Sequence, residues 1–209
     1  MKKHREVKDF RKIERELSDL SGAQRPIILV DTGALIDIQR KSEEGISPDN
    51  RQNSIDIYLR RLEELSDPVI TPENYKEVLK HATVRLNRYE RELSPSALGR
   101  AFLYARRFDE FYTRLQEDER EANSLESWLL VKNHLEILLN QADEYELISP
   151  GDCELLRHGA TFAKTPLRNE EVPRKIILVT SDYNHVARGA QLISQTSNYP
   201  QINFIDTRI

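Results

Sequence analysis

The chain has 209 residues, a formal net charge of −4, 38% hydrophobic residues and 32% charged residues. This length and apolar content suffice for one globular domain with a hydrophobic core, and no stretch approaches the roughly 18 consecutive apolar residues of a membrane span. The one cysteine, Cys153, excludes an intrachain disulfide and a cysteine-based metal cluster. The N-terminal segment is charged throughout and does not have the apolar run of a signal peptide, so we expect a cytoplasmic protein without membrane attachment.

The first elements are predicted from the spacing of apolar residues. Residues 2–20 carry apolar side chains at helical spacing and predict an N-terminal helix. The run IILV at 27–30 has no polar residue, which is typical of a strand buried on both faces of a sheet. Helices are expected at 34–41 and at 54–66, and the pair Asp67-Pro68 is expected to end the second of them.

The segment from 69 onwards predicts a brief strand and then a run of helices. A strand is expected at 69–71, and Thr71-Pro72 predicts the start of a helix over 72–91, with Thr as N-cap and Pro in the first helical position. The remaining expected elements are helices at about 95–119 and 124–141, a strand at 145–148, a helix at 152–163, a strand at 176–179, a helix ending near 194 and a strand at 202–205.

Strands that alternate with helices predict an α/β fold, with a mostly parallel central sheet between two layers of helices. We expect residues 1–25 to form a helical extension and 26–209 to form one three-layer α/β/α domain, with a helical insertion at about 83–143. A second IILV run at 176–179 repeats the first, and both should be adjacent central strands because neither contains a polar residue.

Acidic residues recur near the expected carboxyl ends of the strands, where open parallel sheets place their active sites. Asp31 directly follows the first strand, and Asp182 lies three residues after the second IILV run. Asp152 lies one turn beyond the strand at 145–148, and Glu77 lies two turns inside the helix that follows 69–71. Carboxylates gathered at one edge raise each other's pKa unless a cation neutralises them, and a divalent ion with oxygen ligands is the natural partner.

Each of these acids also has a local explanation. An Asp at a helix start caps backbone amides, and Ser149 to Asp152 has the spacing of a capping box. Glu77 could pair with Lys80 or His81 on a solvated helix face. For a single Asp the capping role is the more common one, so only the set of four favours a metal site.

Four short segments resemble the acidic motifs of PIN domains. They are Asp-Thr-Gly-Ala-Leu-Ile at 31–36, Thr-Pro-x-x-x-x-Glu at 71–77, Ser-Pro-Gly-Asp at 149–152 and Leu-Val-Thr-Ser-Asp at 178–182. The resemblance covers roughly 26–206, and its first and last motifs are the most specific. It implies a divalent-metal-dependent ribonuclease that hydrolyses RNA phosphodiester bonds.

The resemblance also implies roles for individual residues. The acids that would bind one or two Mg²⁺ or Mn²⁺ ions, and would be catalytic through them, are Asp31, Glu77, Asp152 and Asp182. The hydroxyls that would lie near metal or phosphate belong to Thr32, Thr180 and Ser181. The spacing between motifs is longer than in compact members of the family, which leaves Glu154 as an alternative to Asp152 and Glu73 as an alternative to Glu77.

Arginines alternate with aromatic residues between positions 85 and 114. This pattern suits phosphate contact and base stacking, and the candidate contacts are Arg100, Arg106 and Arg107. Four large residues at helical spacing predict a buried stripe instead of an RNA surface, namely Tyr104, Phe108, Phe111 and Leu115.

The expected substrate is RNA, single-stranded or locally unpaired, and a homodimer, a protein partner or an antitoxin remains open. One alternative is a catalytically weak PIN-like module that binds RNA or protein. Another is a Mg²⁺-dependent phosphatase, whose chemistry would want a second Asp where Gly33 stands.

Overall fold

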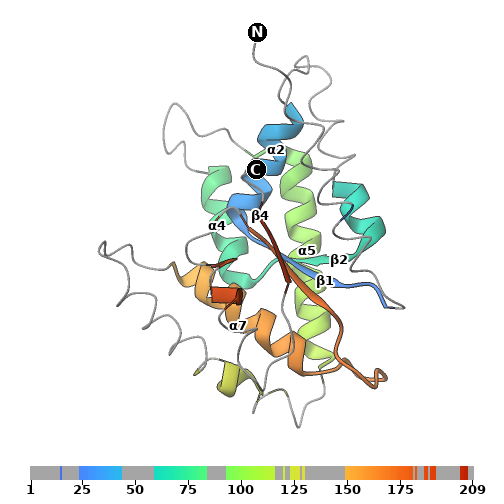
Figure 1. Cartoon of the computed structure of the whole chain (residues 1–209). Helices are drawn as coiled ribbons and strands as arrows, with labels where there is room; N and C mark the ends of the chain where they lie inside the picture. The colour runs from blue at the N-terminus through green and yellow to red at the C-terminus, as the bar shows by residue number, and fades with distance from the viewer. Residues whose placement is uncertain are drawn as a thin grey trace.

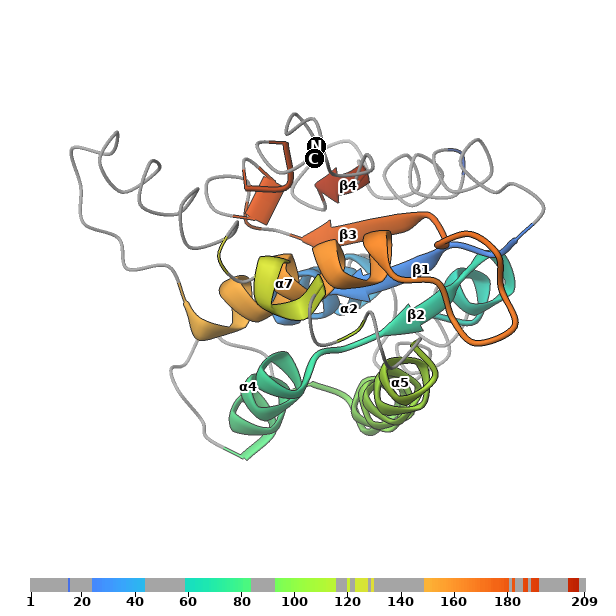
Figure 2. The same ribbon diagram turned by 90° about the horizontal axis from the view of Figure 1, so that it is seen from below.

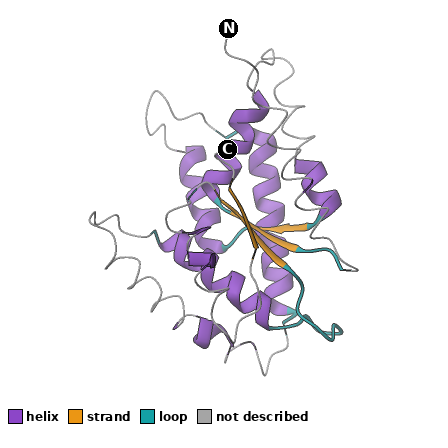
Figure 3. Ribbon diagram, viewed as in Figure 1, coloured by secondary structure: helices purple, strands orange, loops and turns teal. Residues whose placement is uncertain are grey.

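The computed structural model describes residues 15, 24–43, 59–83, 93–115, 120, 123–127, 129, 149–180, 182, 186–187, 189–191 and 203–206. Its elements in chain order are β1 (Ile27–Val30), α2 (Thr32–Glu43), β2 (Asp67–Val69), α4 (Pro72–Thr83), α5 (Pro95–Thr113), α7 (Pro150–Lys164), β3 (Ile176–Thr180) and β4 (Asn203–Asp206) (Figures 1 and 3). The helix expected at 2–20, apart from Arg15, and the strand expected at 145–148 lie outside the described residues. Within the described part, no helix combines the length and apolar character that crossing a bilayer requires.

The strands form one parallel sheet in the order β2-β1-β3-β4. The two IILV runs are β1 and β3, and they pair in parallel with Leu29 opposite Leu178. The prediction that these runs are adjacent central strands is therefore confirmed. The fold is mixed α/β with a parallel sheet.

Successive side chains of β1 and β3 point to opposite faces of the sheet, and both faces are buried. Ile27 and Leu29 belong to an apolar cluster that includes residues of α7 and the second half of α5. Ile28 and Val30 belong to a second cluster with residues of α2, α4 and the first half of α5. Figure 2 shows α7 and α2 on opposite sides of the sheet, with α4 and α5 beside β2. An all-apolar strand sequence follows from this burial, since neither face meets water.

The strand expected at 69–71 lies two residues earlier in the chain than predicted. Asp67-Pro68 was expected to end a helix, and the strand was expected at 69–71, but helix 59–65 is followed at once by β2 over Asp67–Val69. Proline lacks the N–H that a central strand needs, but it is tolerated in an edge strand such as β2. Helix α5 covers this edge, and the Ile70 N–H donates to the Tyr104 carbonyl at 3.3 Å.

Helix α5 ends earlier than the expected 119. It begins after the N-cap Ser94 and closes at Thr113, and Leu115 then forms an isolated antiparallel bridge with Leu167. The predicted buried stripe of Tyr104, Phe108, Phe111 and Leu115 is confirmed. Helix α4 is described to Thr83, and of the helix expected at 124–141 the described residues 124–127 and 129 are helical.

Candidate metal centre

Asp31 is the residue between β1 and α2, at the carboxyl edge of the sheet. Its N–H donates to the Val179 carbonyl of β3 at 2.9 Å, which ties the turn to the neighbouring strand. Its carboxylate accepts a hydrogen bond from the Gly33 N–H, and its carbonyl accepts from Leu35 at 3.1 Å. Asp31 therefore caps α2, as the local explanation predicts.

Asp152 caps α7 through the predicted capping box. Its N–H donates to the Ser149 hydroxyl at 3.1 Å, and its Oδ2 accepts from the Ser149 N–H at 3.3 Å and from the Ser149 hydroxyl at 2.8 Å. The residue is 8% exposed. Capping accounts for the position of Asp152 but not for the neighbours that its charge meets.

The carboxylates of Asp152 and Glu77 lie near the carboxyl group of Asp31, which is 7% exposed. Burial raises the pKa of Asp31 to about 7, helped by the negative charge of Asp152 and, more weakly, of Glu77, while the hydrogen bond from Thr180 opposes the rise. Among the described residues, no lysine or arginine forms an ion pair with Asp31. The edge thus holds a buried acid and two further acids with no basic side chain paired to the central one.

Glu77 reaches this edge because α4 packs closely against the start of α7. The N-cap Thr71 begins α4, with its Oγ1 accepting from the Asn74 N–H at 3.4 Å. At Gly151 a Cβ atom would collide with Asn74 Oδ1 and would lie 3.5 Å from Glu77 Oε2. The glycine permits this approach and so sets the Glu77 carboxylate beside the residue that precedes Asp152.

The two alternative acids have other partners. Glu73 is ion-paired with Lys76. Glu154 accepts from His158 at 2.7 Å and from Arg157 at 3.0 Å, and the hydrogen bond from His158 is the main reason that its pKa is lowered. Within the described residues no ion pair joins Glu77 to Lys80, His81 or any other side chain. The arrangement thus favours Glu77 and Asp152 over Glu73 and Glu154.

Thr180 links Asp31 to Asp182. The buried Thr180 hydroxyl donates to Asp31 Oδ2 at 3.0 Å and accepts from the Asp182 N–H at 2.8 Å. Asp182 is half-buried, and its charge is not among the causes of the raised Asp31 pKa. The structure therefore places Asp182 at the same edge, one hydrogen-bonded residue away from Asp31.

The other two hydroxyl residues differ from Thr180. Thr32 is buried, and its hydroxyl donates to the Asn74 carbonyl at 3.0 Å, which joins α2 to α4. This contact gives Thr32 a structural role beside the acids. Ser181 lies outside the described residues.

The three candidate arginines have different surroundings. Arg100 donates to both carboxylate oxygens of Glu63, at 2.7 and 2.6 Å. Arg107 donates to the Pro68 carbonyl at 3.1 Å, so both side chains fasten α5 to neighbouring elements. Arg106 is exposed and lies 4.0 Å from Glu110. Arg106 is therefore the most accessible of the three for a phosphate.

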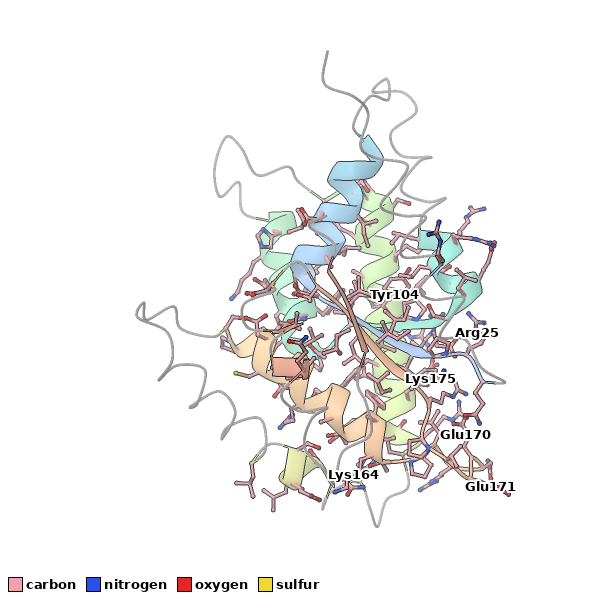
Figure 4. The ribbon with its side chains drawn as sticks, in the orientation of Figure 1. Arg25, Tyr104, Lys164, Glu170, Glu171 and Lys175 are labelled. Atoms are coloured by element: carbon pink, nitrogen blue, oxygen red, sulfur yellow. The ribbon has the colours of Figure 1, made fainter. Side chains whose placement is uncertain are left out.

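At the opposite end of the strands, where β2 begins, the acids Asp67 and Glu170 are paired with arginines. There Arg174 pairs with Asp67 at 2.7 Å and with Glu170 at 2.6 Å, and Arg25 lies 3.7 Å from Asp67. Figure 4 shows Arg25, Glu170 and Lys175 on this side, where the strands begin. Asp31 has no such basic partner among the described residues.

A divalent cation fits the chemistry of the acids at the carboxyl edge, although the described side chains do not form a closed cage. Among them, no three His, Cys, Asp or Glu residues have the arrangement of a preformed metal centre. Mg²⁺ usually binds through one or two carboxylates and keeps several waters, so it does not need such a cage. Asp31, Asp152 and Glu77 offer oxygen ligands and negative charge, and Asp31 has no ion pair with a described basic residue.

Comparison of the chain with protein-family models, curated proteins and solved structures finds no match. The residues at the carboxyl edge are therefore the basis of the functional proposal.

Proposed function

We propose that this chain is a PIN-like, divalent-metal-dependent ribonuclease with a three-layer α/β/α domain. Asp31, Glu77 and Asp152 hold Mg²⁺ or Mn²⁺, and Asp182 flanks them. The observation that supports this most strongly is the buried Asp31, whose pKa is raised by burial and by the charges of Asp152 and Glu77, and which forms no ion pair with a described lysine or arginine. The four motifs that resemble PIN domains favour RNA as the substrate.

The electrostatics of this edge favour cation binding. Removing a carboxylate from water and placing it near like charges is unfavourable unless it is protonated or paired with a cation. A bound divalent ion would return Asp31 to its charged form and relieve the repulsion from Asp152 and Glu77. Capping and metal binding are compatible, since a carboxylate has several lone pairs and the helix caps use only part of them.

The chain's own residues prepare the site for phosphodiester hydrolysis. The hydrogen bonds from Thr180 and Gly33 fix the orientation of the Asp31 carboxylate, so that no rotamer search is needed when a ligand binds. Burial of Asp31 and Asp152 strengthens electrostatic interactions by excluding bulk water. When bound, a divalent ion supplies an activated water and neutralises charge that develops on the phosphate oxygens.

An RNA cleavage assay with matched variants tests this proposal. The purified full chain is incubated with end-labelled single-stranded RNA and with a hairpin, in Mn²⁺, Mg²⁺ or EDTA. We expect cleavage that requires metal, and a loss of at least about 100-fold in Glu77→Gln and Asp31→Asn, because each removes charge that holds the ion.

Glu73→Gln is the matched control, because it removes the same charge from the same helix at a side chain that pairs with Lys76. It should cleave at the wild-type rate. Cleavage that persists in EDTA, or a Glu77→Gln variant as active as Glu73→Gln, would contradict the proposal.

A further inference from the structure

Asn74 on α4 is a buried polar residue without a local role for its side chain. It is 1% exposed, and within the described structure neither its Oδ1 nor its Nδ2 has a hydrogen-bond partner. Buried amide groups in folded proteins nearly always hydrogen-bond, so the unpartnered carboxamide of Asn74 requires an explanation, and a functional role is one.

The backbone of Asn74 is fully engaged, unlike its side chain. Its N–H donates to Thr71 Oγ1 at 3.4 Å, and its carbonyl accepts from Thr32 Oγ1 at 3.0 Å. Asn74 occupies the third position of the helix, from which a capping-box side chain would reach back to the N-cap. Its carboxamide does not do so, and local helix chemistry therefore leaves the side chain unexplained.

The carboxamide lies between the elements that carry the acids. Its Oδ1 sits against Gly151, the residue before Asp152, and Glu77 Oε2 lies 3.5 Å from the position that a Gly151 Cβ would occupy. Thr32, which holds the Asn74 carbonyl, directly follows Asp31. One neutral side chain with two donors and an acceptor thus lies beside the acids of α4 and α7.

We propose that Asn74 is a positioning residue of this site, whose carboxamide hydrogen-bonds the Glu77 or Asp152 carboxylate when these acids bind a divalent cation. This inference rests on the proposed metal site and adds a residue to it. A donor that hydrogen-bonds a ligating carboxylate orients it, and the loss of such a donor commonly weakens metal affinity by about 10- to 100-fold. A neutral amide suits the task because a charged partner would compete with the ion.

Asn74→Leu separates this role from an ordinary structural one. Leucine has a similar shape but no polar atom, and it keeps the backbone hydrogen bonds to Thr71 and Thr32. Because the carboxamide has no hydrogen-bond partner among the described residues, its removal should leave the metal-free Tm unchanged or higher. The dissociation constant for Mn²⁺ should nevertheless rise by about 10- to 100-fold.

Gln39→Leu is the control, because Gln39 is also a buried carboxamide but accepts from the Ser94 N–H at 2.7 Å. It should lower the metal-free Tm and leave Mn²⁺ affinity unchanged. Asn74→Ala is a second test, because it also removes the carboxamide but adds no bulk beside Gly151 and Glu77. It should weaken Mn²⁺ binding in the same direction as Asn74→Leu.

The measurements are Mn²⁺ titration calorimetry and thermal melting in EDTA on the full chain and the three variants. An Asn74→Leu protein that binds Mn²⁺ within about threefold of wild type would overturn the inference, since a positioning residue is worth at least about tenfold. If that variant does not fold, Asn74→Ala decides: weakened binding supports the inference and wild-type binding overturns it. A wild-type chain that binds no Mn²⁺ would overturn the metal site together with the inference.

Discussion

Replacing Asp31 by Asn should stabilise the metal-free protein, and the gain should grow with pH. Each factor of ten in an acid dissociation constant corresponds to about 1.4 kcal/mol, so a rise in pKa from 3.8 to about 7 corresponds to about 4 kcal/mol. The folded state binds the Asp31 proton more tightly than the unfolded state does. The stabilising contribution of the protonated acid is therefore complete below about pH 4 and is lost as pH rises to about 7.

Asparagine does not titrate and keeps one of the two side-chain oxygens as an acceptor, so the variant should escape this loss. Urea unfolding in EDTA, at pH 5 and at pH 8, measures the difference between wild type and Asp31→Asn. We expect the difference to increase by about 2 to 3 kcal/mol in favour of the variant between these pH values, because about two pH units separate pH 5 from the pKa of about 7, at about 1.4 kcal/mol per unit. Other carboxylates titrate in both proteins and largely cancel. A difference that is the same at both pH values would refute the claim that Asp31 titrates abnormally.

Two further predictions follow from the same surroundings. Addition of Mn²⁺ in thermal melts should raise the wild-type Tm more at pH 8 than at pH 5, because binding requires the deprotonated Asp31 carboxylate; an equal rise at both pH values would place the ion elsewhere. Arg100→Ala should lower the free energy of unfolding by about 1 to 3 kcal/mol, because it removes the ion pair to Glu63. Arg106→Ala should change it by less than about 0.5 kcal/mol, because Arg106 and its partner Glu110 are exposed. Urea unfolding of both variants measures the contrast.

Features set by strong local chemistry could be predicted from the sequence. The two IILV runs have no polar residue, so only central strands suit them, and they pair with each other. The cap at Thr71 and the capping box at Ser149 use side-chain oxygens at fixed spacing, and both are present. Since parallel strands end at one edge, the nearness of Asp31 after β1 to Asp182 after β3 also follows from the pairing of these strands.

Features that depend on tertiary context could not be predicted in the same way. Asp67-Pro68 has the sequence of a helix end, yet it belongs to β2, because an edge strand does not need the missing N–H. That Glu77 lies near Gly151 depends on how α4 packs against α7, which no local sequence pattern records. The unpartnered carboxamide of Asn74 could not be predicted from the sequence, because burial and hydrogen-bond partners depend on tertiary packing.

The most direct test of the proposed site is an X-ray structure of the full chain with Mn²⁺ bound, with the ion located by anomalous scattering. We expect an anomalous peak at the carboxyl edge of the sheet, within about 2.6 Å of an Asp31 carboxylate oxygen, with Glu77 or Asp152 as a further direct or water-mediated ligand. The same peak should be absent in Asp31→Asn crystals at equal Mn²⁺ concentration. A wild-type crystal with a strong Mn²⁺ peak elsewhere and none beside Asp31 would contradict the central claim.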